Sequence, residues 1–125
     1  MYGGTDTAPS PMDLLLIGLS GCTGIVMTIA MEHYGVELES LNISAQGSRS
    51  ETGPGEYADM RVHFDAKGKG VSHETMRNAI REFILPKAPV LCTLSKGCPV
   101  TLGYRLDGAT YECAAGSDGF TEVAN

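Results

Sequence analysis

The sequence predicts a two-layer α+β fold in which a long central helix packs on an antiparallel sheet. Two observations lead to this class: a long apolar stretch preceded by helix-start residues, and later segments whose apolar residues alternate along the chain. The predicted elements follow one another as helix, two strands, helix and further strands, which is an α+β order. The 125 residues contain no repeat and no second unit, so we expect a single domain over residues 1–125.

The first predicted helix begins after Ser10 and ends near Tyr34. Ser10 is a good N-cap, Pro11 suits the first helical position because its missing N–H costs nothing there, and Asp13 completes a capping box. Gly35 follows as a helix-ending residue. A helix of this length measures about 35 Å, which makes it the central element of so small a fold.

This helix carries no charge from Leu14 to Met31, which is also long enough to be considered as a membrane span. Three glycines and three hydroxyl residues dilute the apolar stretch, and the rest of the chain has a soluble amphipathic pattern. We therefore expect a helix buried in a soluble core and no contact with a membrane. The remaining chain is too short to cover such a helix by itself, which predicts a homodimer.

Two alternating segments follow and predict an antiparallel pair of strands. Apolar residues occupy positions 41, 43 and 45 of the first segment and positions 60, 62 and 64 of the second. Residues 48–56, which include a Gly-Pro-Gly sequence, form the predicted loop between them. We expect a turn at Lys67–Gly70 before the next helix.

A second amphipathic helix is predicted to begin after Ser72. Its apolar residues follow the helical spacing: Met76, Ala79, Ile80, Phe83 and Ile84. We expect Pro86 and Pro89 to break or kink this helix before Cys92. A strand over residues 100–106 and a hairpin turn at Gly108, leading to a strand over residues 110–113, complete the prediction.

Composition and charge exclude several classes of protein. The formal net charge of −6 and the absence of a basic stripe argue against binding of nucleic acid or of anionic lipid. No basic region precedes the apolar stretch, so a secretory signal is not expected. Four irregularly spaced cysteines are weak support for a disulfide scaffold. These observations predict a cytoplasmic protein with reduced thiols.

The cysteines are the residues with the clearest chemical potential. Cys22 lies within the apolar helix, where a free cysteine is often only a core residue and its thiol is often inert. Cys92 is followed by Cys98, and Lys87 and Lys96 nearby could stabilise a Cys92 thiolate. A second thiol within reach of the first would give a redox pair suited to a hydrophobic substrate.

The other chemistries have little support in the sequence. Cys113 in the last hairpin is expected to be structural. A structural zinc site needs four ligands in tight pairs, whereas His33, His63 and His73 are scattered. The sequence contains no phosphate-binding loop and no serine nucleophile motif. We therefore expect no metal and no cofactor.

Two motifs carry a resemblance to a known family. The sequence GGTDTAPSPMDLLL at residues 3–16, followed by LSGCT at residues 19–23, resembles the OsmC/Ohr family of osmotically induced protein C and organic hydroperoxide resistance proteins, in its OsmC-like branch. Residues 47–49 and 68–70 and the cysteine after the second helix extend the resemblance, which covers about residues 3–106.

The resemblance implies an intertwined homodimer, with two central helices between wrapped sheets and active sites at the subunit interface. It also implies reduction of organic hydroperoxides through a cysteine pair. By position, Cys22 resembles the peroxidatic cysteine and Cys92 the resolving cysteine, with which it would form a disulfide within one subunit. A dithiol reductant would then restore the thiols. Cys98 remains a second candidate for the resolving thiol, and Cys113 is expected to stay free.

The sequence departs from the family pattern at two places. Met12 stands where the organic hydroperoxide resistance branch has a glutamate, and no arginine precedes Cys22. Activation of the Cys22 thiol would then come from one of five later arginines: Arg49, Arg61, Arg77, Arg81 or Arg105. An alternative function is a non-catalytic module that keeps the fold and binds hydrophobic small molecules at the dimer interface.

Overall fold

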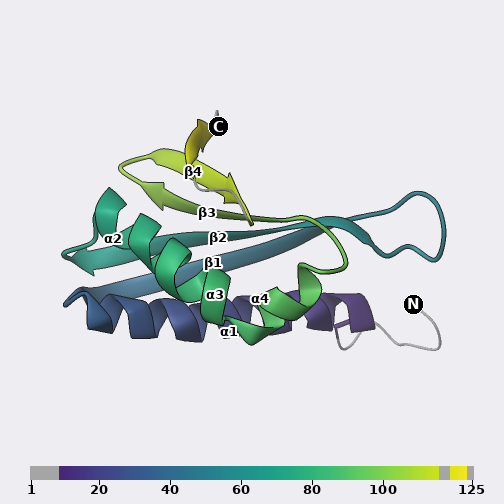
Figure 1. Ribbon diagram of the computed structural model, residues 1–125, viewed down its shortest axis with the longest axis horizontal. Coiled ribbons are helices and arrows are strands. Elements are labelled where there is room, and N and C mark those ends of the chain that lie inside the picture. Colours follow the sequence, from purple (N-terminus) through teal and green to yellow (C-terminus); the bar gives the residue numbers. More distant parts are fainter. Residues whose placement is uncertain (1–8, 116–118, 124–125) are drawn as a thin grey trace.

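All helices lie on one side of a five-stranded sheet, with α1 running along its length (Figure 1). The computed structural model describes residues 9–115 and 119–123. The elements in chain order are α1 (Pro11–His33), β1 (Glu37–Arg49), β2 (Tyr57–Lys69), α2 (His73–Asn78), the π-helical turn η1 (Ala79–Ile84), α3 (Leu85–Lys87), α4 (Pro89–Leu94), β3 (Val100–Leu106), β4 (Ala109–Ala114) and β5 (Thr121–Val123). The predicted α+β class is confirmed.

The predicted ends of α1 are confirmed. The Ser10 hydroxyl accepts a hydrogen bond from the Asp13 N–H at 3.1 Å, and the Asp13 carboxylate accepts one from the Ser10 N–H at 3.2 Å. This capping box satisfies N–H groups that have no partner within the helix. At the other end Tyr34 is the C-cap, and Gly35 follows with φ +74°, a conformation that glycine adopts without strain.

Within a single chain α1 is buried on one side only, as expected for a helix that the remaining chain is too short to cover by itself. Its buried residues lie on one side: Leu19, Thr23, Met27, Ala30 and Met31. Five large apolar residues are exposed: Leu14, Leu15, Ile17, Ile25 and Ile29. α1 is long and apolar enough to cross a membrane by length and composition alone, a test that core helices also pass. The described chain simply has too few residues to cover both sides of this helix.

The predicted β1–β2 pair is antiparallel, and Ile43 lies opposite Phe64 with apolar side chains on the helix side. Both strands have 13 residues and are longer than expected. The predicted turn at residues 67–70 is wrong at its start, because β2 continues to Lys69. Gly68 permits this extension: a Cβ there would lie 2.1 Å from the Glu37 carbonyl oxygen.

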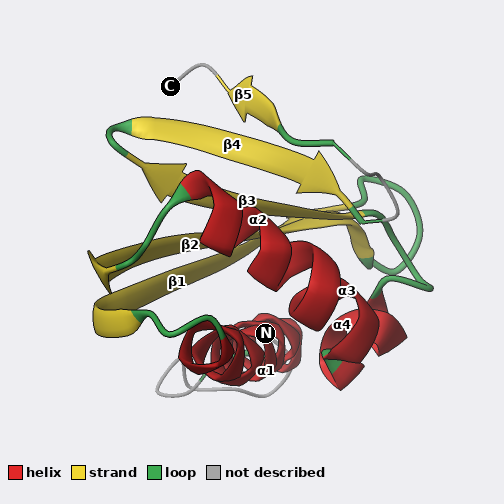
Figure 2. Ribbon diagram, turned by 60° about the vertical axis from the view of Figure 1, so that its left-hand side comes forward, coloured by secondary structure: helices red, strands yellow, loops and turns green. Residues whose placement is uncertain are grey.

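The sheet is mixed, whereas the sequence led us to expect antiparallel strands throughout. Its order is β1-β2-β3-β4-β5, and β2 pairs with β3 in parallel. The helical segment from α2 to α4 forms the crossover that a parallel pair requires (Figure 2). β3 and β4 form the predicted hairpin, with positive φ angles at Asp107 and Gly108 that are typical of a tight two-residue turn.

The second helical segment differs from the prediction near its prolines. Ser72 caps α2 as expected. Pro86 does not end the helix, because the preceding turn η1 is π-helical and the Leu85 N–H bonds to the Ile80 carbonyl five residues back. The break falls at Ala88, whose extended backbone is the conformation favoured before proline. Cys92 therefore lies within the short helix α4, not after the helix.

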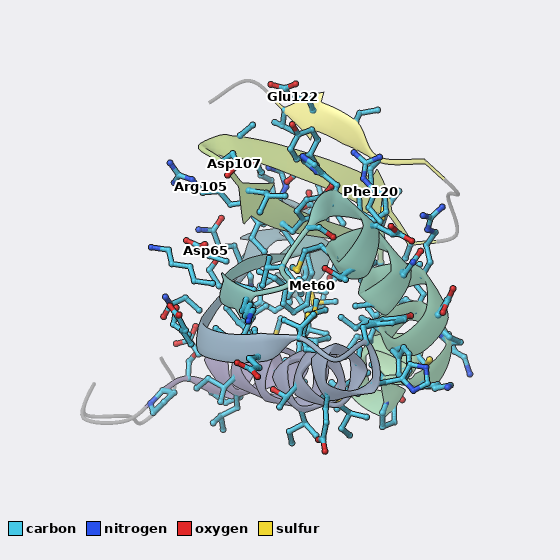
Figure 3. All side chains as sticks on the ribbon, turned by 90° about the vertical axis from the view of Figure 1, so that its left-hand side faces the viewer. Met60, Asp65, Arg105, Asp107, Phe120 and Glu122 are labelled. Atoms are coloured by element: carbon cyan, nitrogen blue, oxygen red, sulfur yellow. The ribbon has the colours of Figure 1, made fainter. Side chains whose placement is uncertain are left out.

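The core fills the space between the sheet and the helices. Met60 points into it from β2, whereas Asp65 and Arg105 lie on the opposite face of the sheet (Figure 3). The alternation predicted for the strands is confirmed by the buried Val62, Phe64, Leu102 and Tyr104. The sheet thus has one face on the core and one polar face.

Candidate functional site

The four cysteines are free thiols on separate parts of the fold. Cys22 lies on α1, Cys92 on α4, Cys98 between α4 and β3, and Cys113 on β4. α1 and α4 pack against each other, so the two helices predicted to carry a redox pair are neighbours. Cys113 is buried in the sheet, and burial raises the pKa of its thiol, in keeping with a structural role.

Cys22 is the middle residue of the 23 in α1 and is half-buried. A Cβ on Gly24 would lie 2.6 Å from Cδ1 of Ile43, so the Gly24 side of the helix faces β1. Residues two apart on an α-helix point about 200° apart. The Cys22 side chain therefore points away from the sheet. It stands at the edge of the exposed apolar stripe, at helical spacing from Leu15 and Ile25.

The Cys92 thiol donates a hydrogen bond to the Leu85 carbonyl oxygen, with a sulfur–oxygen distance of 3.7 Å. In a continuous helix the N–H four residues after Leu85 would bind this carbonyl, but that residue is Pro89, which has no N–H. The expected support from lysine is not seen at this thiol. Lys87 lies over the Phe83 ring, with its Nζ 4.5 Å from the ring centroid, and Lys96 is exposed.

None of the five candidate arginines forms a hydrogen bond with the Cys22 thiol within residues 9–115 and 119–123. Arg77 donates to the Tyr104 hydroxyl at 2.7 Å, and Arg81 lies close enough to Cys113 to affect its ionisation. The remaining three are Arg49, at the end of β1, and the exposed Arg61 and Arg105 on the sheet. Within one chain, the geometry assigns no arginine to the activation of Cys22.

A pocket of about 980 Å³ opens at the end of the molecule where α1 begins. Figure 1 shows the start of α1, the β1–β2 loop and the end of α4 gathered at this end. Its walls come from these segments: Ser10, Pro11, Met12, Leu15, Arg49, Pro54, Gly55, Glu56, Tyr57, Met60, Leu94, Gly97 and Cys98. Neither Cys22 nor Cys92 is among the lining residues. Cys98 is, and burial, followed by the charge of Asp59, raises the pKa of its thiol.

This pocket was not predicted from the sequence. Met12, already noted in the sequence at the start of α1, places an apolar side chain on the pocket wall. The loop residues that close the other side are far from Met12 in the sequence. The Tyr57 hydroxyl makes the link by donating to the Met12 carbonyl at 3.0 Å.

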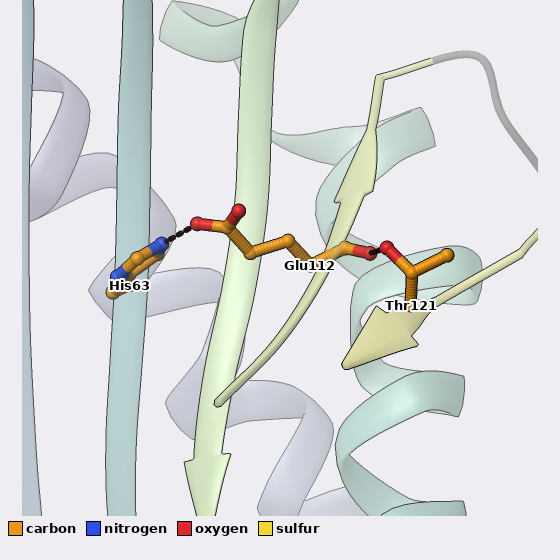
Figure 4. Close-up of polar contacts among 3 residues, drawn as sticks. All are labelled: His63, Glu112 and Thr121. Carbon is orange, nitrogen blue, oxygen red and sulfur yellow. Dashed lines mark hydrogen bonds and ion pairs between the residues drawn. The ribbon is translucent and has the colours of Figure 1, made fainter. Parts of the chain in front are cut away.

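A second polar group lies on the open face of the sheet. His63 on β2 and Glu112 on β4 form an ion pair when the imidazole is protonated, and Thr121 donates to the Glu112 carbonyl at 3.5 Å (Figure 4). Cys113, the next residue after Glu112 on β4, is buried on the opposite, core-facing side of the sheet. In the part of the chain that the structure describes, no group of three or more histidine, cysteine, aspartate or glutamate residues is placed to hold a metal ion.

Comparison with known proteins agrees with this architecture. A family model described as OsmC-like protein matches residues 4–103. Protein YhfA of Escherichia coli (strain K12) is 22% identical over 104 residues, which cover 83% of this chain and 78% of YhfA.

Solved structures with the same fold include two from this family. An OsmC-like protein from Mycoplasma pneumoniae has a TM-score of 0.69 at 18% identity, over 82% of this chain and 77% of that chain. An organic hydroperoxide resistance protein OsmC from Legionella pneumophila, described as a predicted redox protein, has a TM-score of 0.66 at 15% identity, over 83% of this chain and 74% of that chain. The structural likeness establishes the fold, and the family model spans most of the sequence: the chain belongs to the OsmC-like protein family.

Proposed function

We propose that this protein is a thiol-dependent peroxidase that reduces organic hydroperoxides through Cys22 and Cys92. The observation that carries the proposal is the packing of α1 on α4, which places the two helices bearing these free thiols side by side. Cys22 is half-buried and faces away from the sheet beside exposed apolar residues, a setting that favours an apolar peroxide. Membership of the OsmC-like family agrees with redox chemistry.

The reaction balances with one peroxide and one dithiol. The Cys22 thiolate attacks one peroxide oxygen, the S–O bond forms as the O–O bond breaks, and the other oxygen leaves with a proton as an alcohol. The Cys92 thiol then attacks the Cys22 sulfenic acid, which releases water and forms the disulfide. An external dithiol exchanges with this disulfide, is itself oxidised, and returns both cysteines to thiols. The cytoplasm would supply such a reductant.

The proposal includes a homodimer in which two copies of α1 pack along their exposed apolar sides. Ile25 is 66% exposed in a single chain, and large apolar side chains clustered in this way mark an interaction surface. Gly18 and Gly21 lie on the same side, and a Cβ on either would meet no atom within 4 Å. The glycines leave room for a second helix to approach closely, next to Cys22.

The test is consumption of cumene hydroperoxide with a dithiol reductant, measured by stopped flow against hydrogen peroxide. We expect turnover by the unmodified protein and loss of turnover in Cys22→Ser. The Cys92→Ser variant should complete one turnover without forming an intramolecular disulfide. Cys113→Ser is the matched control and should retain activity.

Peptide mapping after mild peroxide treatment identifies the bonded pair. We expect a Cys22–Cys92 bond within one subunit and Cys113 free. A Cys92–Cys98 bond with Cys22 unmodified would contradict the assignment of Cys22 as the attacking thiol. Absence of turnover with either peroxide, together with saturable binding of an apolar probe, would favour a non-catalytic binding module.

A further inference from the structure

The pocket at the start of α1 contains a cation, Arg49, that within residues 9–115 and 119–123 forms no hydrogen bond with the Cys22 thiol. Arg49 lines this pocket, and its Nε donates to the Gly55 carbonyl in the β1–β2 loop. Its guanidinium carbon lies 5.8 Å from the centroid of the Tyr57 ring. Within residues 9–115 and 119–123 no acidic side chain forms an ion pair with Arg49. The guanidinium is thus oriented through Nε, while its terminal nitrogens form no ion pair within those residues.

The one acidic side chain on the pocket wall does not neutralise this cation. The Glu56 carboxylate is turned toward Gly53 in the loop, with its oxygen 3.4 Å from the position of a Cβ there. Glu56 is exposed, and no ion pair joins it to Arg49 in the described part of the chain. The pocket therefore offers a positive group to a ligand.

The rest of the wall is largely apolar and anchored. Met60 is 2% exposed and belongs to the core, so it presents a fixed surface at the base of the pocket. Met12, Leu15 and Leu94 supply apolar side chains from α1 and α4. The hydrogen bond from Tyr57 to the Met12 carbonyl joins the loop side to the helix side. A cavity of about 980 Å³ is within the size range of sites for small organic ligands.

We propose that this pocket binds an amphipathic monocarboxylate, such as a medium-chain fatty acid. The carboxylate is held by the terminal nitrogens of Arg49, because a guanidinium forms paired, charge-assisted hydrogen bonds with a planar carboxylate. The hydrocarbon chain lies against Met12, Leu15 and Met60, where its burial removes apolar surface from water. Within one chain neither Cys22 nor Cys92 lines the pocket, and the proposal concerns the binding of a carboxylate and no step of the peroxidase reaction.

The test is isothermal titration calorimetry with decanoate and, separately, with 1-decanol, which has a similar chain and no charge. We expect Arg49→Gln to weaken decanoate binding by about ten- to a hundredfold, the effect of losing a hydrogen bond to a charged group. Binding of 1-decanol should be the same in both proteins. Arg61→Gln is the matched control, because Arg61 is exposed on the same sheet and does not line the pocket. It should bind decanoate like the unmodified protein.

A second measurement uses the unmodified protein and needs no variant to fold. Cys98 lines the pocket and Cys92 does not, so saturating decanoate should slow alkylation of Cys98 while leaving the rate at Cys92 unchanged. The proposal is overturned if decanoate fails to bind, if it binds equally well to Arg49→Gln, or if it leaves the alkylation of Cys98 unchanged. Because no step involves peroxide, these outcomes are separate from success or failure of the peroxidase assay.

Discussion

His63 and Glu112 meet across Gly103, the β3 residue that lies between them in the register of the sheet. A Cβ on Gly103 would lie 2.8 Å from Cδ2 of His63 and 2.9 Å from the Tyr111 carbonyl oxygen. The missing side chain is therefore the reason that residues on two non-adjacent strands can form a direct ion pair. Glycine is needed at position 103 because atoms of the neighbouring strands approach it closely, and not because its backbone adopts an unusual angle.

Gly103→Ala should destabilise the protein by about 1–3 kcal/mol, because one of the close atoms is backbone and cannot move aside at low cost. Urea unfolding followed by circular dichroism measures this change. Gly97→Ala is the control: its Cβ would lie 3.6 Å from the Leu94 carbonyl oxygen, an ordinary contact. The two variants should differ clearly in midpoint, and equal midpoints would contradict the steric account.

Gly18→Ala and Gly21→Ala should separate chain stability from association. An added Cβ meets nothing in the single chain, and alanine is favoured over glycine in a helix by about 0.5–1 kcal/mol. If two α1 helices pack closely at these glycines, the same methyl groups weaken the dimer. We expect sedimentation equilibrium to show a larger monomer fraction for both variants.

Gly24→Ala provides the contrast to these two substitutions. Its Cβ would lie 2.6 Å from Cδ1 of Ile43 in the same chain, so the side chain of Ile43 must shift and the stability gained from alanine should be smaller than at Gly18 and Gly21. Unchanged association in Gly18→Ala and Gly21→Ala would argue against a dimer built on this side of α1.

Pro89→Ala should slow disulfide formation between Cys22 and Cys92. The substitution supplies an N–H for the Leu85 carbonyl and releases Ala88 from its extended conformation, so α3 and α4 can join into one helix. Cys92 then points in a new direction. Quenched-flow alkylation with mass spectrometry measures the rate, and Pro86→Ala, which leaves the break at Ala88 in place, should behave like the unmodified protein.

The phenol of Tyr34 should titrate far above its ordinary range. Its pKa is raised to about 12 by burial, which is the largest cause, together with its hydrogen bond to Glu82 and the charge of that carboxylate. The folded pKa exceeds the ordinary value of 10.0, so the stability linked to neutral Tyr34 is complete below about pH 10 and is lost as pH rises toward about 12. Absorbance titration near 295 nm should show this transition shifted to lower pH in Glu82→Gln.

Asp59→Asn should increase the reactivity of Cys98. The Asp59 charge helps to raise the pKa of this thiol, and only the thiolate reacts with iodoacetamide. Removing the charge lowers the pKa and enlarges the thiolate fraction at neutral pH. Peptide mass spectrometry after timed alkylation should show faster labelling at Cys98. The labelling of Cys113 should not change, because the pKa of that thiol is affected by burial and by Arg81 and not by Asp59. Equal rates at Cys98 would show that burial alone controls this thiol.

Local features of the sequence predicted the elements well where one short-range signal decides the structure. The Ser10 capping box, the Ser72 cap, the alternation in β1 and β2 and the Gly108 hairpin are all signals of this kind. The parallel pairing of β2 and β3 was missed because it depends on the path of the intervening crossover. β5 was missed because three residues carry too little alternation to be recognised.

The candidate site was predictable only in part, for a related reason. Family resemblance selected Cys22 and Cys92 from four cysteines, and the neighbouring positions of their helices agree with that selection. The pocket could not be foreseen, because Met12, Arg49 and Leu94 come together only when three separate segments fold to the same end. The failure of Pro86 to end its helix reflects the preceding π turn, for which the sequence gives no simple signal.

The π turn at Ala79–Ile84 also sets the helical phase of α3 (Leu85–Lys87), which continues from it without a break. Such a turn is equivalent to one residue inserted into an α-helix, and one residue corresponds to a rotation of about 100°. Deleting a single residue from this turn would restore ordinary helical winding but rotate the downstream residues by that angle. Leu85 in α3 would turn with them, so its carbonyl would no longer face the Cys92 thiol. The length of this segment is therefore under tighter constraint than its composition, and single-residue deletions in it should be more damaging than most substitutions.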